Sequence, residues 1–182
     1  HGLILSEQYP DLLPALLKSM DDSVVQVSFK ATLSAGQFSG EQVVSALARI
    51  IEKRGQDPWF RTAVLSAPSG SSLDLLNNLI KQHSFLEKAE TWRKSFLEDF
   101  SFVTGAANKP KDIAALLDIL SRPAMGEWRE AGLKGLTTAL KKHEVSDPAL
   151  KETLLGISTT SDKDIQVGIE RLRKAYSTRS GL

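Results

Sequence analysis

Apolar side chains recur at helical spacing along almost the whole chain, and this feature limits the possible fold more than any other. Within each of three stretches the residues fall at i, i+4 and i+7, which places them on one helix face. These are Val43, Leu47 and Ile50, then Ile113, Leu117 and Leu120, then Ile165, Ile169 and Leu172. No stretch bounded by turn signals alternates between apolar and polar residues, as a half-buried strand would. The sequence therefore predicts an all-α fold.

N-cap signals and chain breaks divide this pattern into about ten helices. The candidate N-caps are Ser39 with Gln42 as a capping box, Asp57 and Asp147 each followed by Pro, Ser71 or Ser72, and Ser161. The predicted helices cover residues 5–19, 22–34, 39–54, 57–67, 71–83, 86–104, 110–121, 124–142, 147–158 and 162–177.

A short pattern repeats weakly along the chain. An Asp that is predicted to cap a helix is followed three residues later by an apolar residue, then by a long polar or basic residue, and two positions after that by a small residue. Copies begin at Asp22, Asp57, Asp147 and Asp162, with a partial copy from Glu127. Internal repetition at this scale is typical of stacked helix pairs, in which each pair contacts only its neighbours.

Several of these copies carry a family resemblance. The stretch Asp57-Pro-Trp59-Phe60-Arg61-Thr-Ala63-Val64-Leu65 resembles HEAT repeats. Residues 46–66 look like the HEAT-like segment of large bacterial, membrane-bound, haem-binding dehydrogenases of the PVC type, and residues 93–105 and 128–136 are similar to it. The resemblance implies a HEAT-like right-handed α-solenoid of about ten helices in about five repeats, forming one domain over residues 1–182. The poor repetition within 86–142 predicts an irregular middle.

The same resemblance implies a function for the segment. In that family it lies between a propeller related to glucose or sorbosone dehydrogenases and a C-terminal cytochrome c domain. This chain has no cysteine, and hence no Cys-x-x-Cys-His for haem attachment. We therefore expect a non-catalytic scaffold without a cofactor of its own, whose partners are other domains of the same polypeptide or another protein. The resemblance places the parent protein outside the cytoplasm, and a chain that begins at His1 without Met is interpreted as an excised piece.

Two other function classes stay open at this stage. A stand-alone protein-binding HEAT module would have the same sequence features. A HEAT-like DNA glycosylase would need a basic concave face with aromatic residues, whereas this chain has 23 basic and 22 acidic residues and a net charge of +1. Its apolar runs are also shorter than a membrane span requires. The composition therefore argues against nucleic acid and against membrane insertion.

Three tryptophans and their basic neighbours are the candidate interaction residues. Trp59 and Trp128 occupy early positions of repeated helices, near Arg61 and Arg129, and Trp92 precedes Arg93. Packing between helices is the favoured interpretation, because an amphipathic ring near a helix start often fills the gap between stacked units. Asp57 and Arg61 lie four residues apart, which places opposite charges on one helix face.

The glycines within one predicted helix suggest a close neighbour. Gly126, Gly132 and Gly135 each cost about 1 kcal/mol relative to Ala in a helix interior. We expect another helix to pass close to them, above all at Gly132. In contrast, Phe96, Phe100 and Val103 are predicted core residues.

The remaining polar candidates have ordinary structural interpretations. His83 and His143 are expected at helix C-termini and have no nearby metal ligands in the sequence. The segment Ser66–Ser72 lacks the Gly-Lys-Ser/Thr of a phosphate loop and is predicted to be a turn. The acid pairs Asp21–Asp22 and Asp162/Asp164 are expected at helix starts.

Overall fold

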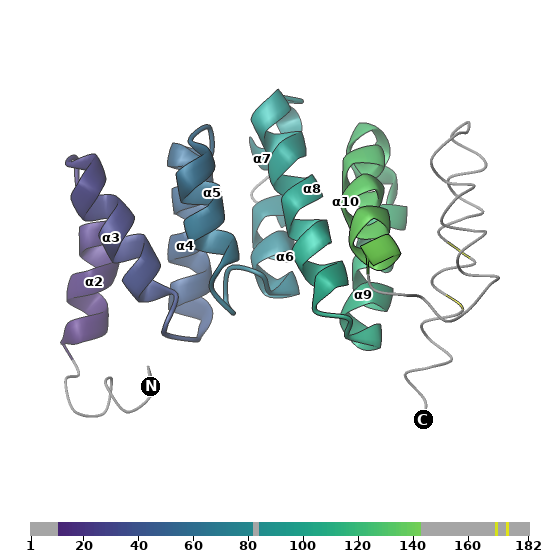
Figure 1. Ribbon diagram of the computed structural model, residues 1–182. Helices are drawn as coiled ribbons and strands as arrows, with labels where there is room; N and C mark the ends of the chain where they lie inside the picture. The colour runs from purple at the N-terminus through teal and green to yellow at the C-terminus, as the bar shows by residue number, and fades with distance from the viewer. Residues whose placement is uncertain (1–10, 82–83, 143–169, 171–173, 175–182) are drawn as a thin grey trace. The chain divides into compact units, whose positions relative to one another are not determined.

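Every regular element that the computed structural model describes is a helix, which confirms the all-α prediction for those residues (Figure 1). The structure describes residues 11–81 and 84–142, together with Glu170 and Lys174. Contacts divide the chain into two compact units, with the boundary in the sequence between Lys88 and Ala89. The first unit contains α2 (Leu12–Met20), α3 (Val25–Ala35), α4 (Glu41–Arg54), α5 (Pro58–Leu65), α6 (Leu73–Lys81) and α7 (Ser84–Glu87). The second contains α8 (Thr91–Ala106), α9 (Pro110–Ser121), the 3-10 helix η1 (Pro123–Trp128) and α10 (Arg129–Lys142).

The helix predicted over residues 86–104 is divided in two. Helix α7 ends at Glu87 and α8 begins at Thr91. Glu90 has extended backbone, and its Oε2 accepts hydrogen bonds of 3.0 Å from Trp92 Nε1 and from Arg93 Nε. These two side chains fix the start of α8 at this point, which the apolar spacing alone did not indicate.

The helix predicted over residues 124–142 is also divided, because its first turn is 3-10. Arg122 is extended, as residues before proline usually are, and Pro123 opens η1. The tighter winding buries Met125 and Trp128, which are 1% and 2% exposed. Helix α10 then continues directly from η1. The predicted helix at 147–158, and the candidate caps Asp147 and Ser161, lie outside the described residues, as does the predicted helix at 162–177 apart from Glu170 and Lys174, which are helical.

Two of the predicted helix caps are confirmed. Asp57 Oδ1 accepts a hydrogen bond of 2.9 Å from Trp59 N, with Pro58 as the first residue of α5. Ser72 Oγ accepts one of 3.3 Å from Leu75 N at the start of α6. Both are local signals, in which the cap and its target lie within three residues.

Two other cap predictions are wrong. The capping box of Ser39 and Gln42 does not form, because the N-cap of α4 is one residue later, at Gly40, whose φ of 117° is a backbone conformation that favours glycine. The N-cap of α3 is Val24, and Asp22 lies two residues before it. Asp22 Oδ1 instead accepts a hydrogen bond of 2.7 Å from Val24 N and closes the turn that leads into the helix.

In the first unit, alternate helices touch as well as consecutive ones (Figure 1). Helix α2 packs against α3 and α4, α3 also packs against α5, and α4 packs against α5 and α6. Helix α4 therefore has neighbours on several sides, which explains its broad buried face. That face consists of Val43, Val44, Ala46, Leu47, Ala48, Ile50 and Ile51.

Helices α3 and α5 run in the same direction. The rings of Phe29 and Phe60 meet edge to face with centroids 5.4 Å apart. Just after the C-terminal ends of the two helices, Gly36 and Ala67 lie in close contact, because a Cβ added to Gly36 would be only 2.5 Å from Ala67 Cβ. The residues of both pairs are 31 positions apart in sequence, as are Phe38 and Ser69, which are joined by a hydrogen bond of 3.1 Å. A constant offset along the contact requires parallel helices.

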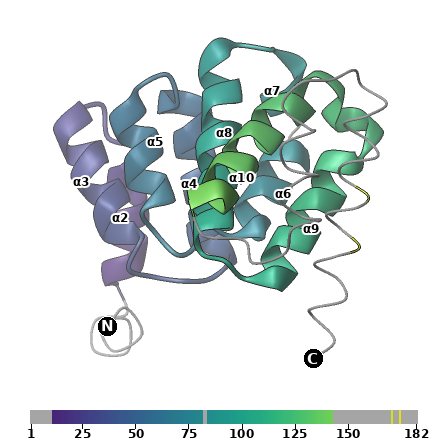
Figure 2. The ribbon, with the colours of Figure 1, turned by 45° about the vertical axis from the view of Figure 1, so that its right-hand side comes forward.

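In the second unit, α8 packs along α10 in the same parallel sense (Figure 2). The matching pairs are Lys94 with Glu127, Gly105 with Ala139, and Glu98 with Lys134, at offsets of 33, 34 and 36 residues. Phe96 and Phe100 of α8 are fully buried, as predicted, whereas Val103 is half-buried. Helix α9 packs against both α8 and α10 and completes the core.

Candidate functional site

The residues Asp57, Trp59 and Arg61 lie together at the start of α5. The Asp57 carboxylate caps the helix, as described above. The Arg61 guanidinium donates through Nη1 to the carbonyl oxygens of Gly55 and Gln56, at 2.8 and 3.3 Å. These carbonyls follow the end of α4, so Arg61 neutralises the negative end of the preceding helix. Trp59 contributes little to the core and is 70% exposed.

Trp128 and Arg129 lie at the junction of η1 and α10, where both are buried. Trp128 is 2% exposed and Arg129 8%. Arg129 Nε donates to Leu120 O at 2.9 Å, and its Nη2 donates to Arg122 O at 3.5 Å. Arg129 thus binds the end of α9 in the way that Arg61 binds the end of α4.

This shared role of the arginines corrects the expected equivalence of the tryptophans. If Arg129 corresponds to Arg61, then Trp128 corresponds to Phe60, which is 1% exposed, and not to Trp59. Trp128 fills space between helices, as the packing interpretation predicts. Trp59 does not, so packing is the wrong interpretation for that residue.

A third aromatic residue followed by Arg opens α8. The Arg93 guanidinium lies 4.8 Å from the Trp92 ring centroid, and Glu90 holds both side chains. Arg93 is 8% exposed and Trp92 is half-buried. The pairs Phe60-Arg61, Trp92-Arg93 and Trp128-Arg129 are each followed four residues after the arginine by a leucine: Leu65, Leu97 and Leu133. The sequence analysis did not use this shared spacing, which shows that Phe60, Trp92 and Trp128 occupy equivalent positions.

The candidate residues therefore fall into two groups. Asp57, Trp59 and Arg61 belong to the first unit, and Trp92, Trp128, Arg129 and Gly132 to the second. Within the second unit, Lys94 lies next to Trp128, with Nζ 6.0 Å from its ring centroid and 3.2 Å from Glu127 Oε2.

The predicted close approach is present at Gly132 and Gly135 and absent at Gly126. A Cβ on Gly132 would lie 2.5 Å from Leu120 Cδ2 of α9. A Cβ on Gly135 would overlap the backbone carbonyl of Glu98 in α8, with the carbonyl carbon at 2.8 Å. Gly126 has open space on its Cβ side, so the prediction is wrong there. Gly132 and Gly135 therefore allow close packing between helices within the second unit.

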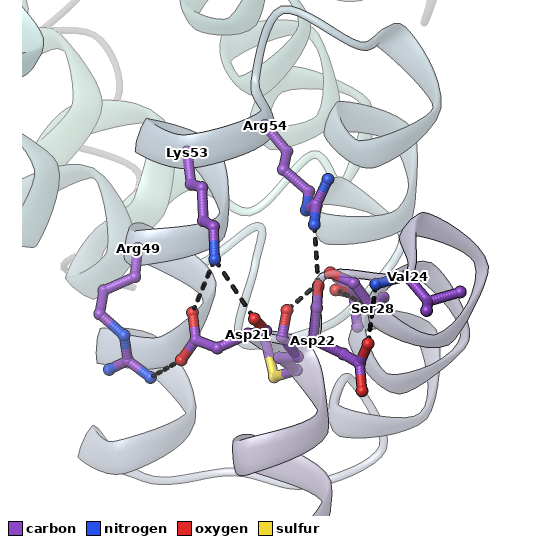
Figure 3. A network of polar contacts seen from close by, with 9 residues as sticks. Asp21, Asp22, Val24, Ser28, Arg49, Lys53 and Arg54 are labelled. Carbon is purple, nitrogen blue, oxygen red and sulfur yellow. Dashed lines mark hydrogen bonds and ion pairs between the residues drawn. The ribbon is translucent and has the colours of Figure 1, made fainter.

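A polar network at the turn between α2 and α3 was not predicted (Figure 3). Asp21 is at the C-cap of α2, not at a helix start, and its carboxylate pairs with Arg49 and Lys53 of α4 at 3.3 and 3.8 Å. The backbone carbonyls that end α2 are also bound. They accept hydrogen bonds from Ser28 Oγ (to Met20 O, 2.6 Å), Lys53 Nζ (to Asp21 O, 3.3 Å) and Arg54 Nη2 (to Asp22 O, 2.9 Å).

The serine-rich segment before α6 is a turn, as predicted. Ser69 Oγ donates to Phe38 O, Ser71 Oγ to Ala67 O and Ser72 Oγ to Ser69 O. The backbone N–H groups of Gly70 and Ser71 donate to Ala67 O. The alternative to a plain turn is an anion site on free backbone N–H groups, and it has no support here because these groups bind the chain itself.

Within the described ranges, no group of three or more His, Cys, Asp or Glu side chains is placed to hold a metal ion. His83 and His143 lie outside those ranges, as do Asp162 and Asp164. No helix in the described part of the chain is long and apolar enough to cross a membrane.

The geometry of the candidate residues is that of a packed helical framework with one exposed aromatic side chain. Asp57, Arg61 and Arg129 bind backbone groups of neighbouring turns, and Gly132 lets α9 approach α10. Comparison with protein-family models, curated proteins and solved structures finds no match for this chain.

Proposed function

We propose that this chain is a non-catalytic helical-repeat scaffold. The observation that carries the proposal is the parallel alignment of alternate helices at similar offsets, 31 residues for α3 with α5 and 33 to 36 for α8 with α10. Consecutive units of an α-solenoid are related in this way, because each helix pair contacts the same part of the next pair. The proposed architecture is a HEAT-like right-handed α-solenoid of about five repeats within one domain.

The polar residues support a scaffold over an enzyme. The arginines at helix starts, Arg61 and Arg129, donate to the carbonyls that end the preceding helix. In a DNA glycosylase, basic side chains of this kind would face a phosphate backbone. Here they serve to join one helix to the next.

By its resemblance to PVC-type dehydrogenases, the scaffold would space a propeller-type dehydrogenase domain and a cytochrome c domain in a larger redox protein. The test is the intact mass and haem absorbance of the protein as its native cell produces it. We expect a product several times heavier than 19.9 kDa with covalently bound haem. A free product of that size without haem would contradict the redox context.

A second candidate function is a stand-alone protein-binding module, and the exposure of Trp59 favours it. Tryptophan is enriched at the centres of protein interfaces, where its large ring is buried on binding. A side chain of this type that is 70% exposed has apolar area available for a partner. In the native mass experiment, this function corresponds to the small, haem-free product.

A further inference from the structure

The first two turns of α2 carry no polar side chain. Residues 12–17 are Leu-Leu-Pro-Ala-Leu-Leu, and the polar residues of the helix, Lys18 and Ser19, come in its last turn. A helix that is apolar on all sides is normally buried on all sides. Yet Met20 is the one residue of α2 that is fully buried, and Leu12 is 38% exposed. The composition of α2 is that of an interior helix, whereas its surroundings leave it partly open.

Helix α4 occupies the equivalent place in the next helix pair. The C-caps of α2 and α4 are Asp21 and Gly55, 34 residues apart, which lies within the range of 31 to 36 found for the parallel contacts. At this offset the four leucines of α2 correspond to apolar residues of α4: Leu12 to Ala46, Leu13 to Leu47, Leu16 to Ile50 and Leu17 to Ile51. The α4 residues are 1% exposed or less, whereas Leu13, Leu16 and Leu17 are half-buried.

The neighbours of the two helices explain this difference in burial. Among the described helices, α4 packs against α2, α3, α5 and α6, whereas α2 packs against α3 and α4. Helices α2 and α3 form one end of the first unit (Figure 1). A helix placed against α2 as α2 is placed against α4 would supply the contacts that the four leucines lack.

The distribution of charge along these helices is opposite to their exposure. Helix α2 has one charged residue in nine, whereas the better covered α4 has five in fourteen. An end of a helical array that faces water needs a polar outer side to stay soluble. Helix α2 lacks such a side, so it does not have the composition of a terminal helix.

We propose that α2 is covered by a further helix pair of the same repeat, which precedes it in the same polypeptide. Consecutive pairs in this chain pack on each other, so the pair ahead of α2 would lie against it as α2 lies against α4. Burial of the area of the four leucines that is still exposed would stabilise the contact. This inference rests on the proposed scaffold function and extends the array beyond α2.

The first test is limited proteolysis of the protein as its native cell produces it, followed by the mass of the resistant fragment that contains α2. We expect this fragment to begin at least one repeat, 31 to 36 residues, ahead of α2. Circular dichroism against the chain of 182 residues should show that the added residues are helical. A fragment that begins within the present sequence, a native product that begins at His1, or added residues that form β-structure would each overturn the proposal.

The second test compares variants of that fragment with the same variants of the 182-residue chain. Leu12→Gln should lower the urea midpoint at least about twice as much in the fragment, because the further helix pair covers Leu12 only there. Lys18→Gln is the matched control on the same helix. Lys18 corresponds to Glu52, which keeps contact with solvent on the covered helix α4, so this variant should shift neither midpoint. Equal shifts for Leu12→Gln in both proteins would overturn the proposal, and a native dimer that Leu12→Gln dissociates in sedimentation would assign the face to a second copy instead.

The further helix pair and the redox context can fail separately. A helical extension on a haem-free native product would support the helix pair and reject the redox context. A haem-containing product whose resistant fragment begins at α2 would do the reverse.

Discussion

The parallel contact between α3 and α5 and the parallel contact between α8 and α10 have different chemistry. In the first unit two aromatic rings, Phe29 and Phe60, fill the space between the helices at a centroid distance of 5.4 Å. In the second unit Gly135 lies against the backbone of Glu98, and Gly105 lies against Ala139. One helix pair is therefore separated by large side chains, and the other is in close backbone contact.

This difference shows which property the two contacts share. Both contacts keep a parallel direction and an offset of 31 to 36 residues, and each brings a glycine against an alanine, Gly36 with Ala67 and Gly105 with Ala139, while their other contact residues differ. Aromatic-arginine pairs recur at the starts of α5, α8 and α10, but not at the start of α3. The offset is therefore the shared property, which explains why the repetition in the sequence is weak.

The largest expected effect comes from removing a ring at the α3–α5 contact. Phe60→Ala should lower the free energy of unfolding by about 4 kcal/mol, because it leaves a cavity at a fully packed site. Urea denaturation of the full chain, followed by circular dichroism, would measure the change. Trp59→Ala is the matched control one residue away, and its exposed ring should contribute less than about 0.5 kcal/mol. Equal losses for the two variants would contradict the assignment of Phe60 to the contact.

At the α8–α10 contact, stability should be lost when atoms are added, whereas at the α3–α5 contact it is lost when a ring is removed. Gly135→Ala should destabilise the protein by about 3 kcal/mol, because its Cβ would overlap the Glu98 carbonyl and the helices would have to separate. Gly132→Ala should cost less, because a Leu120 side chain can move aside more easily than backbone. Gly132→Leu, with a much larger side chain, should approach the effect of Gly135→Ala.

Gly126→Ala is the control for this glycine series. Its Cβ side is open, so unfolding should be unchanged within about 0.5 kcal/mol. Urea denaturation of all four variants would rank them. A loss at Gly126→Ala as large as that at Gly135→Ala would contradict close packing as the cause of these losses, because a Cβ on Gly126 meets no neighbouring atom.

The arginines at the helix starts should show a smaller, graded effect. Arg129→Met keeps much of the apolar stem but leaves the buried Leu120 carbonyl without its 2.9 Å donor, which should cost about 2 kcal/mol. Arg61→Met should cost less, because Arg61 is only half-buried and water can reach the freed carbonyls. Arg122→Met is the exposed control, and thermal unfolding would order the three variants. The reverse order would contradict the proposed role of Arg129.

The sequence predicted those features whose cause is local. The caps at Asp57 and Ser72 depend on groups within three residues, and the helical periodicity of α4 or α9 depends on one face of a single helix. The capping box predicted at Ser39 is absent, although Ser39 and Gln42 have the residue types and the spacing that it requires. The positive φ of Gly40 is imposed by the path of the chain into α4, which no spacing of residues reveals.

The candidate site was predicted in part for the same reason. The sequence draws attention to the tryptophans, but the residues next to Trp59 and Trp128 do not show which of the two is buried. The burial of Trp128 depends on the 3-10 winding of η1, and the exposure of Trp59 depends on what packs around α5. The contact of Arg129 with Leu120 spans nine residues and two elements, beyond the reach of a local pattern.

The smallest expected effect concerns the ion pairs at the α8–α10 contact. Lys134 Nζ lies 3.0 Å from the Glu98 carboxylate, and both side chains are accessible to solvent, so Lys134→Gln should cost only about 0.5 kcal/mol. That cost should largely disappear in about 1 M salt, where the screening length is near 3 Å. The loss caused by Phe60→Ala should change little under the same conditions, since no charge is removed. If urea denaturation showed equal salt dependence for both variants, the two contacts would not differ in chemistry as described.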